Sequence, residues 1–189
     1  SKQADYLFVS APENVSWLLN IRGYDSPNSP ISNARLIIDK NKKIYLIAEK
    51  TKMFNIIKEK KIKKDQVINN SDFLILINNL SGKNIIIDDK TCSIFYENIV
   101  KKKFKILKLN DPIYKLKSIK NIHEIEHMIE AHKKDGLALT KFIFWIKNIN
   151  KKVITEVDAQ NKLEKFRKLS KNYLFPSFNT IAGTRSNGA

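Results

Sequence analysis

Short apolar runs alternate with helical patterns over the first hundred residues. Each run has the length of a buried strand, and each intervening segment places apolar residues three or four positions apart. The polar residues 39–42 separate two of the runs and predict a β-hairpin. This alternation is typical of an α/β fold with a mixed sheet flanked by helices. The predicted strands are residues 6–9, 34–38, 44–47, 84–88 and 104–109, and the predicted helices are residues 10–20, 50–60, 71–80 and 91–101.

Capping residues predict where the first helices begin. Ser10 is the predicted cap of the first helix, with Pro12 in its first turn and Glu13 completing a capping box. Ser71 is the predicted cap of the helix at 71–80. The apolar run inside that helix fits a buried strand equally well, because periodicity does not separate the two in so short a segment.

The patterning changes at Asn110-Asp111-Pro112, beyond which long helices replace the short elements. We therefore place a domain boundary there, with one domain at 1–110 and a second segment at 111–189. A helix at 155–170 and a strand at 177–182 are predicted within the second segment.

A helix at 121–148 is the longest predicted element, and Asn121 and Glu124 form its capping box. Apolar residues recur along it at 3-4 spacing, which predicts one buried face. His132 lies in this stripe and is expected to be a half-buried, hydrogen-bonded structural histidine. The stripe consists of Ile122, Ile125, Ile129, His132, Gly136, Leu139, Ile143 and Ile146.

The charge composition limits the classes of function that the chain could have. Lys and Arg number 35 against 19 Asp and Glu, giving a net charge of +16, which fits a basic binding module for nucleic acid or for a partner subunit. Only four of the basic residues are arginines and the lysines are scattered, so we interpret them as solvated faces and expect no nucleic-acid partner. No apolar run is long enough for a membrane helix, and no membrane partner is expected.

The lone Cys92 permits no internal disulfide and indicates a reducing, cytoplasmic compartment. A cysteine nucleophile would need a base placed beside it. We therefore interpret Cys92 as a small apolar residue of the helix at 91–101.

Residues 123–127 match the zinc-protease pattern H-E-x-x-H. On a helix, His123 and His127 share one face, and Glu124 could act as a base toward a zinc-bound water. That face points about 160° away from the apolar stripe at ~100° per residue, toward lysines rather than into a cleft. Glu156 is the candidate for a third ligand. We interpret both histidines as residues of a solvated face, with a zinc protease as the alternative.

Two stretches carry a family resemblance. The segment 14–30 contains Trp17, Arg22, Asp25 and Pro27, and the segment 176–189 ends the chain. In this order and at this distance they resemble the long-form Xaa-Pro aminopeptidases of the creatinase/prolidase/methionine-aminopeptidase superfamily. The resemblance implies a ribonuclease-H-like, creatinase N-terminal-like domain at 1–110. It also implies that 111–189 form the first helices and strand of an incomplete pita-bread α+β domain.

The resemblance also implies a function for the parent protein. The family enzymes release the N-terminal residue that precedes proline in a peptide substrate. They use two divalent metal ions, commonly manganese, held by two Asp, one His and two Glu. All of these ligands would lie beyond Ala189, so the resemblance implies that the fragment has no metal site or catalytic residue and is inactive by itself.

The resemblance further singles out Arg22 and Arg185. Arg22 is the candidate substrate-binding residue, as a contact near the substrate entrance or the dimer partner. The structural alternative is a tie from Arg22 to Asp25 or to a carbonyl of its loop. Arg185 stands where the family pattern has glycine. An open second domain would expose apolar surface between Val153 and Ile181, which predicts homodimer formation.

Overall fold

A computed structural model describes residues 4–149 and 153–188 of the chain. The chain divides into two compact units, Ser1–Ile119 (unit 1) and Lys120–Ala189 (unit 2). Each unit is described by itself.

Unit 1 is built on a six-stranded mixed sheet with the order β4-β3-β2-β1-β5-β6. The central strand β1 pairs antiparallel with β2 and parallel with β5, and β3 pairs antiparallel with β2. β4 and β6 add parallel edges on the two sides. The α/β class predicted from the sequence is confirmed. The strands are β1 (Tyr6–Val9), β2 (Arg35–Asp39), β3 (Ile44–Ile47), β4 (Val67–Ile68), β5 (Asn84–Ile87) and β6 (Lys105–Lys108).

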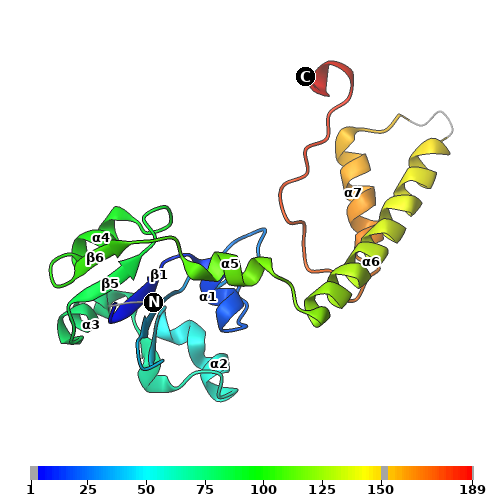
Figure 1. The fold of residues 1–189 in the computed structure, drawn as a ribbon. Helices are drawn as coiled ribbons and strands as arrows, with labels where there is room; N and C mark the ends of the chain where they lie inside the picture. Colours follow the sequence, from blue (N-terminus) through cyan, green and yellow to red (C-terminus); the bar gives the residue numbers. More distant parts are fainter. Residues whose placement is uncertain (1–3, 150–152, 189) are drawn as a thin grey trace. The chain divides into compact units, whose positions relative to one another are not determined.

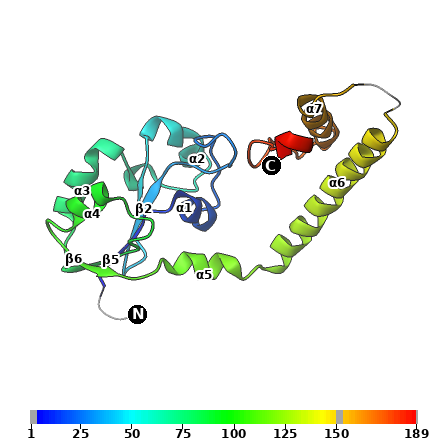
Figure 2. The same cartoon turned by 90° about the horizontal axis from the view of Figure 1, so that it is seen from above.

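Helices cover both faces of this sheet because successive side chains of each strand point to opposite sides. In β1, Phe8 joins the core cluster formed with α3 and α4, and Val9 joins the cluster formed with α1 and α2. Figures 1 and 2 show these two helix pairs on opposite sides of the strands. The helices are α1 (Pro12–Leu18), α2 (Phe54–Lys58), α3 (Phe73–Asn79), α4 (Ile94–Val100) and α5 (Pro112–Ser118), and the 3-10 turns are η1 (Lys50–Met53), η2 (Lys64–Gln66) and η3 (Asn70–Asp72).

All five predicted strands and the hairpin are confirmed. Asp39 closes the hairpin, since its Oδ1 accepts hydrogen bonds from the N–H groups of Asn41 (2.7 Å) and Lys43 (2.8 Å). The ambiguous run Phe73 to Ile77 is helical, in α3. The sequence prediction missed β4, because two residues are too few for a periodic pattern.

The predicted caps of α1 and α3 are wrong. Ala11 is the N-cap of α1 and makes no side-chain capping bond, and the Ser10 hydroxyl instead bonds the hydroxyl of Thr91 at 2.8 Å. Glu13 accepts a hydrogen bond from the Tyr114 hydroxyl at 2.6 Å rather than closing a capping box. Ser71 lies inside η3, and Asp72 is the N-cap of α3. Long-range partners replace the local ones at Ser10 and Glu13, whereas the Ser71 hydroxyl bonds its neighbours Asn69 and Asp72.

Asp111 caps α5, a helix that the sequence prediction missed. Its Oδ1 accepts from the N–H of Ile113 at 2.9 Å, and its Oδ2 accepts from the Asn14 amide of α1 at 2.7 Å. The Asp111 N–H donates to Asp88 Oδ2 at 2.7 Å, directly after β5. Asn14, Asp88 and Asp111 are all buried. Three elements distant in sequence therefore meet at one polar joint.

The compact first unit extends to Ile119, and the domain boundary at about residue 110 stays a prediction. Ile113 of α5 is 2% exposed and belongs to the core cluster shared with α1 and α2. Lys117 also donates to the Asn14 side chain at 2.5 Å. Asp111-Pro112 is thus a helix start, with an N-cap followed by proline at the first helical position, inside unit 1.

Unit 2 contains two helices that lie against each other (Figure 1). α6 (Ile122–Lys147) begins with the predicted capping box of Asn121 and Glu124. α7 (Glu156–Arg167) begins with a capping box of Thr155 and Asp158. A 3-10 turn, η4 (Arg185–Gly188), lies near the end of the chain.

The predicted buried stripe of α6 is wrong for this chain. Its isoleucines and Leu139 are between 40% and 62% exposed, whereas Ala138 of the neighbouring face is 5% exposed. Phe142 and Trp145 are half-buried on the α7 side, with ring centroids 5.8 Å apart. His132 is exposed rather than half-buried, although its Nδ1 lies 2.8 Å from the Met128 carbonyl oxygen. A helix buries only the face that a partner covers, and α7 covers the other one.

The strand predicted at 177–182 is also wrong, because this segment is irregular and pairs with no strand among the described residues. The backbone groups of a strand need hydrogen-bond partners on a neighbouring strand, and the described part of unit 2 contains no strand. The expected exposed apolar surface is present: Val153, Phe178 and Ile181 are 98%, 67% and 92% exposed. In the described part of the chain, no helix is both long and apolar enough to cross a membrane.

We expect Asp111→Ala to lower the free energy of unfolding of unit 1 by about 2–4 kcal/mol. It removes a helix N-cap, worth about 1 kcal/mol, and leaves the buried Asn14 amide without its acceptor, at about 1–3 kcal/mol. Urea unfolding followed by circular dichroism measures this loss. Asp89→Ala is the matched control. The Asp89 side chain is half-exposed and its ion pair with Lys108 is long, at 3.7 Å, so its loss should change the free energy of unfolding by less than about 0.5 kcal/mol. Equal effects of the two substitutions would refute the joint at Asp111.

Candidate functional site

His123 and His127 point into solvent from the first turns of α6. The His123 side chain is 81% exposed, and its Nδ1 lies 3.5 Å from Glu126. Glu124, the would-be base, accepts from the Asn121 N–H at 2.9 Å in the capping box. Within residues 4–149 and 153–188, no three His, Cys, Asp or Glu side chains come close enough together to hold a metal ion. Glu124 is thus the member of the motif that takes part in the capping box at the start of α6.

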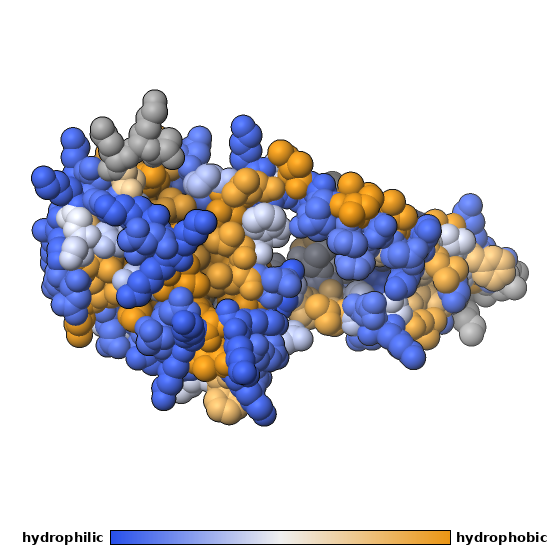
Figure 3. Space-filling model, turned by 60° about the horizontal axis from the view of Figure 1, so that its bottom comes forward, coloured by the Kyte–Doolittle hydropathy of each residue, from blue (hydrophilic) through white to orange (hydrophobic). Residues whose placement is uncertain are grey.

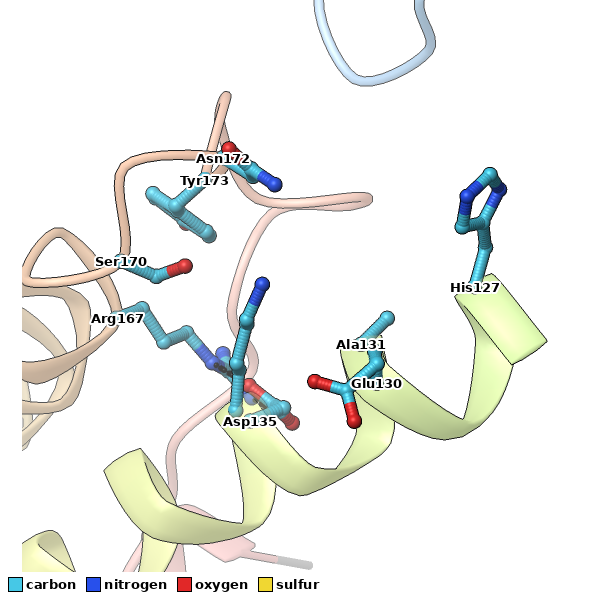
Figure 4. A pocket seen from close by; sticks show the side chains of 9 residues that line it. His127, Glu130, Ala131, Asp135, Arg167, Ser170, Asn172 and Tyr173 are labelled. Atoms are coloured by element: carbon cyan, nitrogen blue, oxygen red, sulfur yellow. Dashed lines mark hydrogen bonds and ion pairs between the residues drawn. The ribbon is translucent and has the colours of Figure 1, made fainter.

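His127 lies at one end of a groove between α6 and the segment after α7. The groove has a volume of about 490 Å³. Arg167 of α7 reaches Asp135 of α6 through Nε at 2.7 Å and Nη2 at 3.3 Å. Figure 4 shows this pair at the end of the groove away from His127. The hydrogen bond from Arg167 to Asp135 raises the pKa of the guanidinium.

Tyr173 forms part of the same groove and is also held in a fixed position. Its hydroxyl donates to Glu164 Oε2 at 2.8 Å. Burial, followed by this bond to Glu164, raises the pKa of Tyr173 to about 12, so the phenol is neutral at physiological pH. Arg167 is thus paired with Asp135, which ties α7 to α6, and Tyr173 with Glu164, which ties the segment after α7 to that helix; neither contact activates a nucleophile or base.

Glu156, the candidate third zinc ligand, binds the end of the chain instead. Its Oε1 accepts from the N–H of Thr184 at 2.7 Å and from the Asn187 amide at 3.3 Å. Arg185, which stands where the family pattern has glycine, has φ of +53°, a left-handed conformation that glycine adopts readily. The backbone at this turn therefore keeps a glycine-like geometry despite the arginine.

Arg22 holds its own loop. Its Nη1 donates to the carbonyl oxygens of Ile21 (2.9 Å) and Ser16 (3.3 Å). Asp25 accepts from the N–H of Asn33 (2.9 Å) and from Lys52 Nζ (2.6 Å), and the bond to Lys52 lowers the pKa of its carboxyl. Of the two structural ties considered for Arg22, the geometry matches the carbonyl rather than Asp25. The substrate-binding role of Arg22 stays a prediction.

The polar cluster at Asn14, Asp88 and Asp111 was not predicted from the sequence. The tripeptide 110–112 contained the signal, since Asp followed by Pro is a frequent helix start. Long-range partners such as Asn14 carry no local signal. Within the described chain, the buried polar side chains of this cluster all have hydrogen-bond partners, which indicates a structural function.

Cys92 is buried in the turn before α4, rather than inside a helix as predicted. It is 8% exposed and belongs to the core cluster beneath α3 and α4. Burial raises the pKa of the Cys92 thiol from 9.0 to about 11. Folding is therefore favoured while the thiol is neutral, and this contribution is lost as the pH rises from about 9 towards 11.

We expect iodoacetamide to alkylate native Cys92 at pH 8 at least about a hundredfold more slowly than an unperturbed thiol. A pKa of about 11 leaves about one thiol in a thousand as the reactive thiolate at this pH. Mass spectrometry of timed samples measures the rate. The same chain in urea is the control and should react at the rate of a free thiol. A native rate equal to the unfolded rate would show that Cys92 is accessible and ionised.

A family profile and curated relatives match the chain. The Creatinase/Prolidase N-terminal domain family matches residues 1–124. Xaa-Pro aminopeptidase 1 of Dictyostelium discoideum is 30% identical over 195 aligned residues, covering the whole chain and 31% of that protein. The Xaa-Pro aminopeptidase ApepP of Drosophila melanogaster is 31% identical, covering the whole chain and 32% of that protein. The chain thus spans about a third of the length of these relatives.

Solved structures share the fold. The crystal structure of an X-prolyl aminopeptidase from Caenorhabditis elegans, described as a cytosolic enzyme with a di-nuclear active site, matches with a TM-score of 0.78 and 22% identity. The match covers 94% of this chain and 30% of the Caenorhabditis elegans protein. An X-Pro aminopeptidase from Thermotoga maritima matches with a TM-score of 0.61 and 15% identity, over 88% of this chain and 47% of that one. The family match over residues 1–124, together with the six-stranded sheet, shows that the chain belongs to the creatinase/prolidase N-terminal domain family.

Proposed function

We propose that the chain is a fragment of a metallo-aminopeptidase that releases the N-terminal residue preceding proline. In this proposal the first domain and the start of the pita-bread domain act as scaffold, and the catalytic residues lie elsewhere in the parent protein. The observation that supports it best is the continuous similarity to Xaa-Pro aminopeptidases. It extends over the whole chain, past residue 124, where the match to the N-terminal domain family ends.

The proposal assigns two divalent metal ions, manganese by the family resemblance, to the parent protein. The described residues do not fit such a pair, because they contain no group of three or more side chains able to hold a metal ion. What these residues do is hold the joint at Asp111, the loop at Arg22 and the α6–α7 pair in place.

The proposal also includes a cytoplasmic location and a homodimer. The lone buried Cys92 fits a reducing compartment, as does the description of the Caenorhabditis elegans protein as cytosolic. The exposed apolar residues of α6 and of the segment after α7 would be covered by further protein, either the rest of the parent or a second copy. Light scattering of the chain at increasing concentration distinguishes a monomer from a dimer.

We expect the 189-residue chain to release no amino acid from a peptide with proline second, with or without manganese. Chromatography of the products measures this release. The full-length protein encoded by the same coding sequence is the control and should show manganese-dependent release. Manganese-dependent release by the 189-residue chain alone would overturn the assignment, and metal analysis that found one tightly bound zinc, lost in His127→Ala, would favour the zinc-protease alternative.

We expect Arg22→Ala to lower the stability of the chain by about 1 kcal/mol, the usual value of a hydrogen bond to a backbone carbonyl, through loss of its bonds at the end of α1. Urea unfolding measures this change. In the full-length enzyme the KM for a peptide with proline second should stay within about twofold, because a loop-holding residue does not touch substrate. A raised KM with unchanged stability would instead assign Arg22 to substrate binding.

A further inference from the structure

A groove on unit 1 has an apolar floor and a basic rim. It lies beside α2, between η1 and the edge strand β4, and has a volume of about 1170 Å³. Phe54, Ile57 and Val67 supply its apolar surface, and Lys50, Lys58 and Lys64 supply ammonium groups around it. None of these residues belongs to the groove between α6 and the segment after α7, or to the polar joint at Asp111.

The apolar floor is exposed although the segment that carries it is firmly packed. Met53 and Ile62, on either side of α2, are 4% and 5% exposed and belong to the core cluster on this face of the sheet. Phe54 lies about 100° further round the helix than Met53 and is 67% exposed. Val67 of β4 is 2% exposed and closes the floor from beneath. The exposed aromatic ring therefore stands over a recess with an apolar base.

The rim of the groove carries a net positive charge, since it has three lysines and one aspartate. Residues 50–64 contain seven lysines and one acidic residue, Glu59. Lys52 and Lys61 pair with carboxylates at 2.6 and 2.8 Å, whereas no ion pair forms at Lys50, Lys58 or Lys64 in the described residues. Asp65 is the acidic residue of the lining.

The shape and charge of the groove favour an acidic protein segment as its ligand over a nucleic acid or a membrane surface. On the face that Figure 3 shows, apolar side chains of unit 1 lie in a band between hydrophilic ones. A single-stranded nucleic acid would need a row of aromatic rings on which successive bases stack. The groove has a single aromatic ring, that of Phe54. A membrane surface needs protruding apolar side chains, whereas Val67 lies at the base of a recess. A segment with apolar side chains on one side and carboxylates beside them matches both floor and rim.

We propose that this groove is a docking site for an acidic, amphipathic segment of a partner protein. The partner's apolar side chains contact Phe54, Ile57 and Val67, and its carboxylates pair with Lys50, Lys58 and Lys64. This inference is independent of the aminopeptidase assignment, since it rests only on residues of the groove.

The test uses the 189-residue chain and a fluorescein-labelled peptide of leucine and glutamate arranged at amphipathic helical spacing. Fluorescence anisotropy should show saturable binding that weakens as the salt concentration rises. Two control peptides should bind at least about tenfold more weakly: one with the same composition in scrambled order, and one with lysine in place of glutamate. Equal binding of the ordered and scrambled peptides would overturn the proposal, because it would reflect net charge alone.

Matched variants locate the binding site. Lys58→Glu combined with Lys64→Glu should weaken peptide binding at least about tenfold, and Phe54→Ser should weaken it about tenfold. The control pair Lys101→Glu with Lys102→Glu changes the net charge equally outside the groove, and Phe95→Ser removes another ring, 63% exposed. These controls should change affinity less than about twofold. Equal weakening by groove and control variants would refute the site.

Two further measurements make every outcome decisive. Circular dichroism melting curves of the groove variants should match that of the unmodified chain, because the substituted side chains are exposed. Phe54→Leu, which keeps an apolar side chain, should restore most of the affinity and guards against a folding defect in Phe54→Ser. Binding of an oligonucleotide or of phosphatidylserine vesicles that the groove variants abolish, without any peptide binding, would assign the groove to that polyanion and overturn the proposal.

Discussion

The carboxylate of Asp111 joins parts of unit 1 that hydrophobic packing alone would leave loosely connected. Asn14 of α1, the first turn of α5 and the end of β5 all meet it or its N–H. A buried carboxylate is tolerated only when donors surround it; here one donor is local, the Ile113 N–H, and the other, the Asn14 amide, comes from α1. The direction in which α5 leaves the sheet is therefore set by hydrogen bonds, which are more directional than apolar contacts.

The sheet shows why most of unit 1 could be predicted from sequence. Both faces of β1 are buried, so Tyr6 to Val9 form a continuous apolar run, and the hairpin turn at Asp39 is specified by local hydrogen bonds. Caps that depend on tertiary partners could not be predicted. Ser10 and Glu13 have the right spacing for a capping box, but their side chains form hydrogen bonds with Thr91 and Tyr114 instead. β4 is visible only through its pairing with β3.

The candidate sites show the same division between local and long-range information. The capping box of Asn121 and Glu124 was predicted because it lies within four residues, and it explains why Glu124 is unavailable as a base. The contacts of Glu156 could not be predicted from the sequence, because its partners Thr184 and Asn187 lie 28 and 31 residues further along the chain. Similarity to Xaa-Pro aminopeptidases supplies the functional context that these isolated contacts do not contain.

The two apolar faces of α6 have a consequence for handling the protein. One face packs on α7, while Ile125, Ile129 and Ile143 remain 42%, 50% and 43% exposed. The net charge of +16 keeps copies of the chain apart through electrostatic repulsion, which opposes self-association through this face. Kosmotropic anions such as sulfate screen that repulsion and strengthen apolar contacts at once. The colloidal stability of the chain is thus greatest in dilute buffer and declines steeply as sulfate is added.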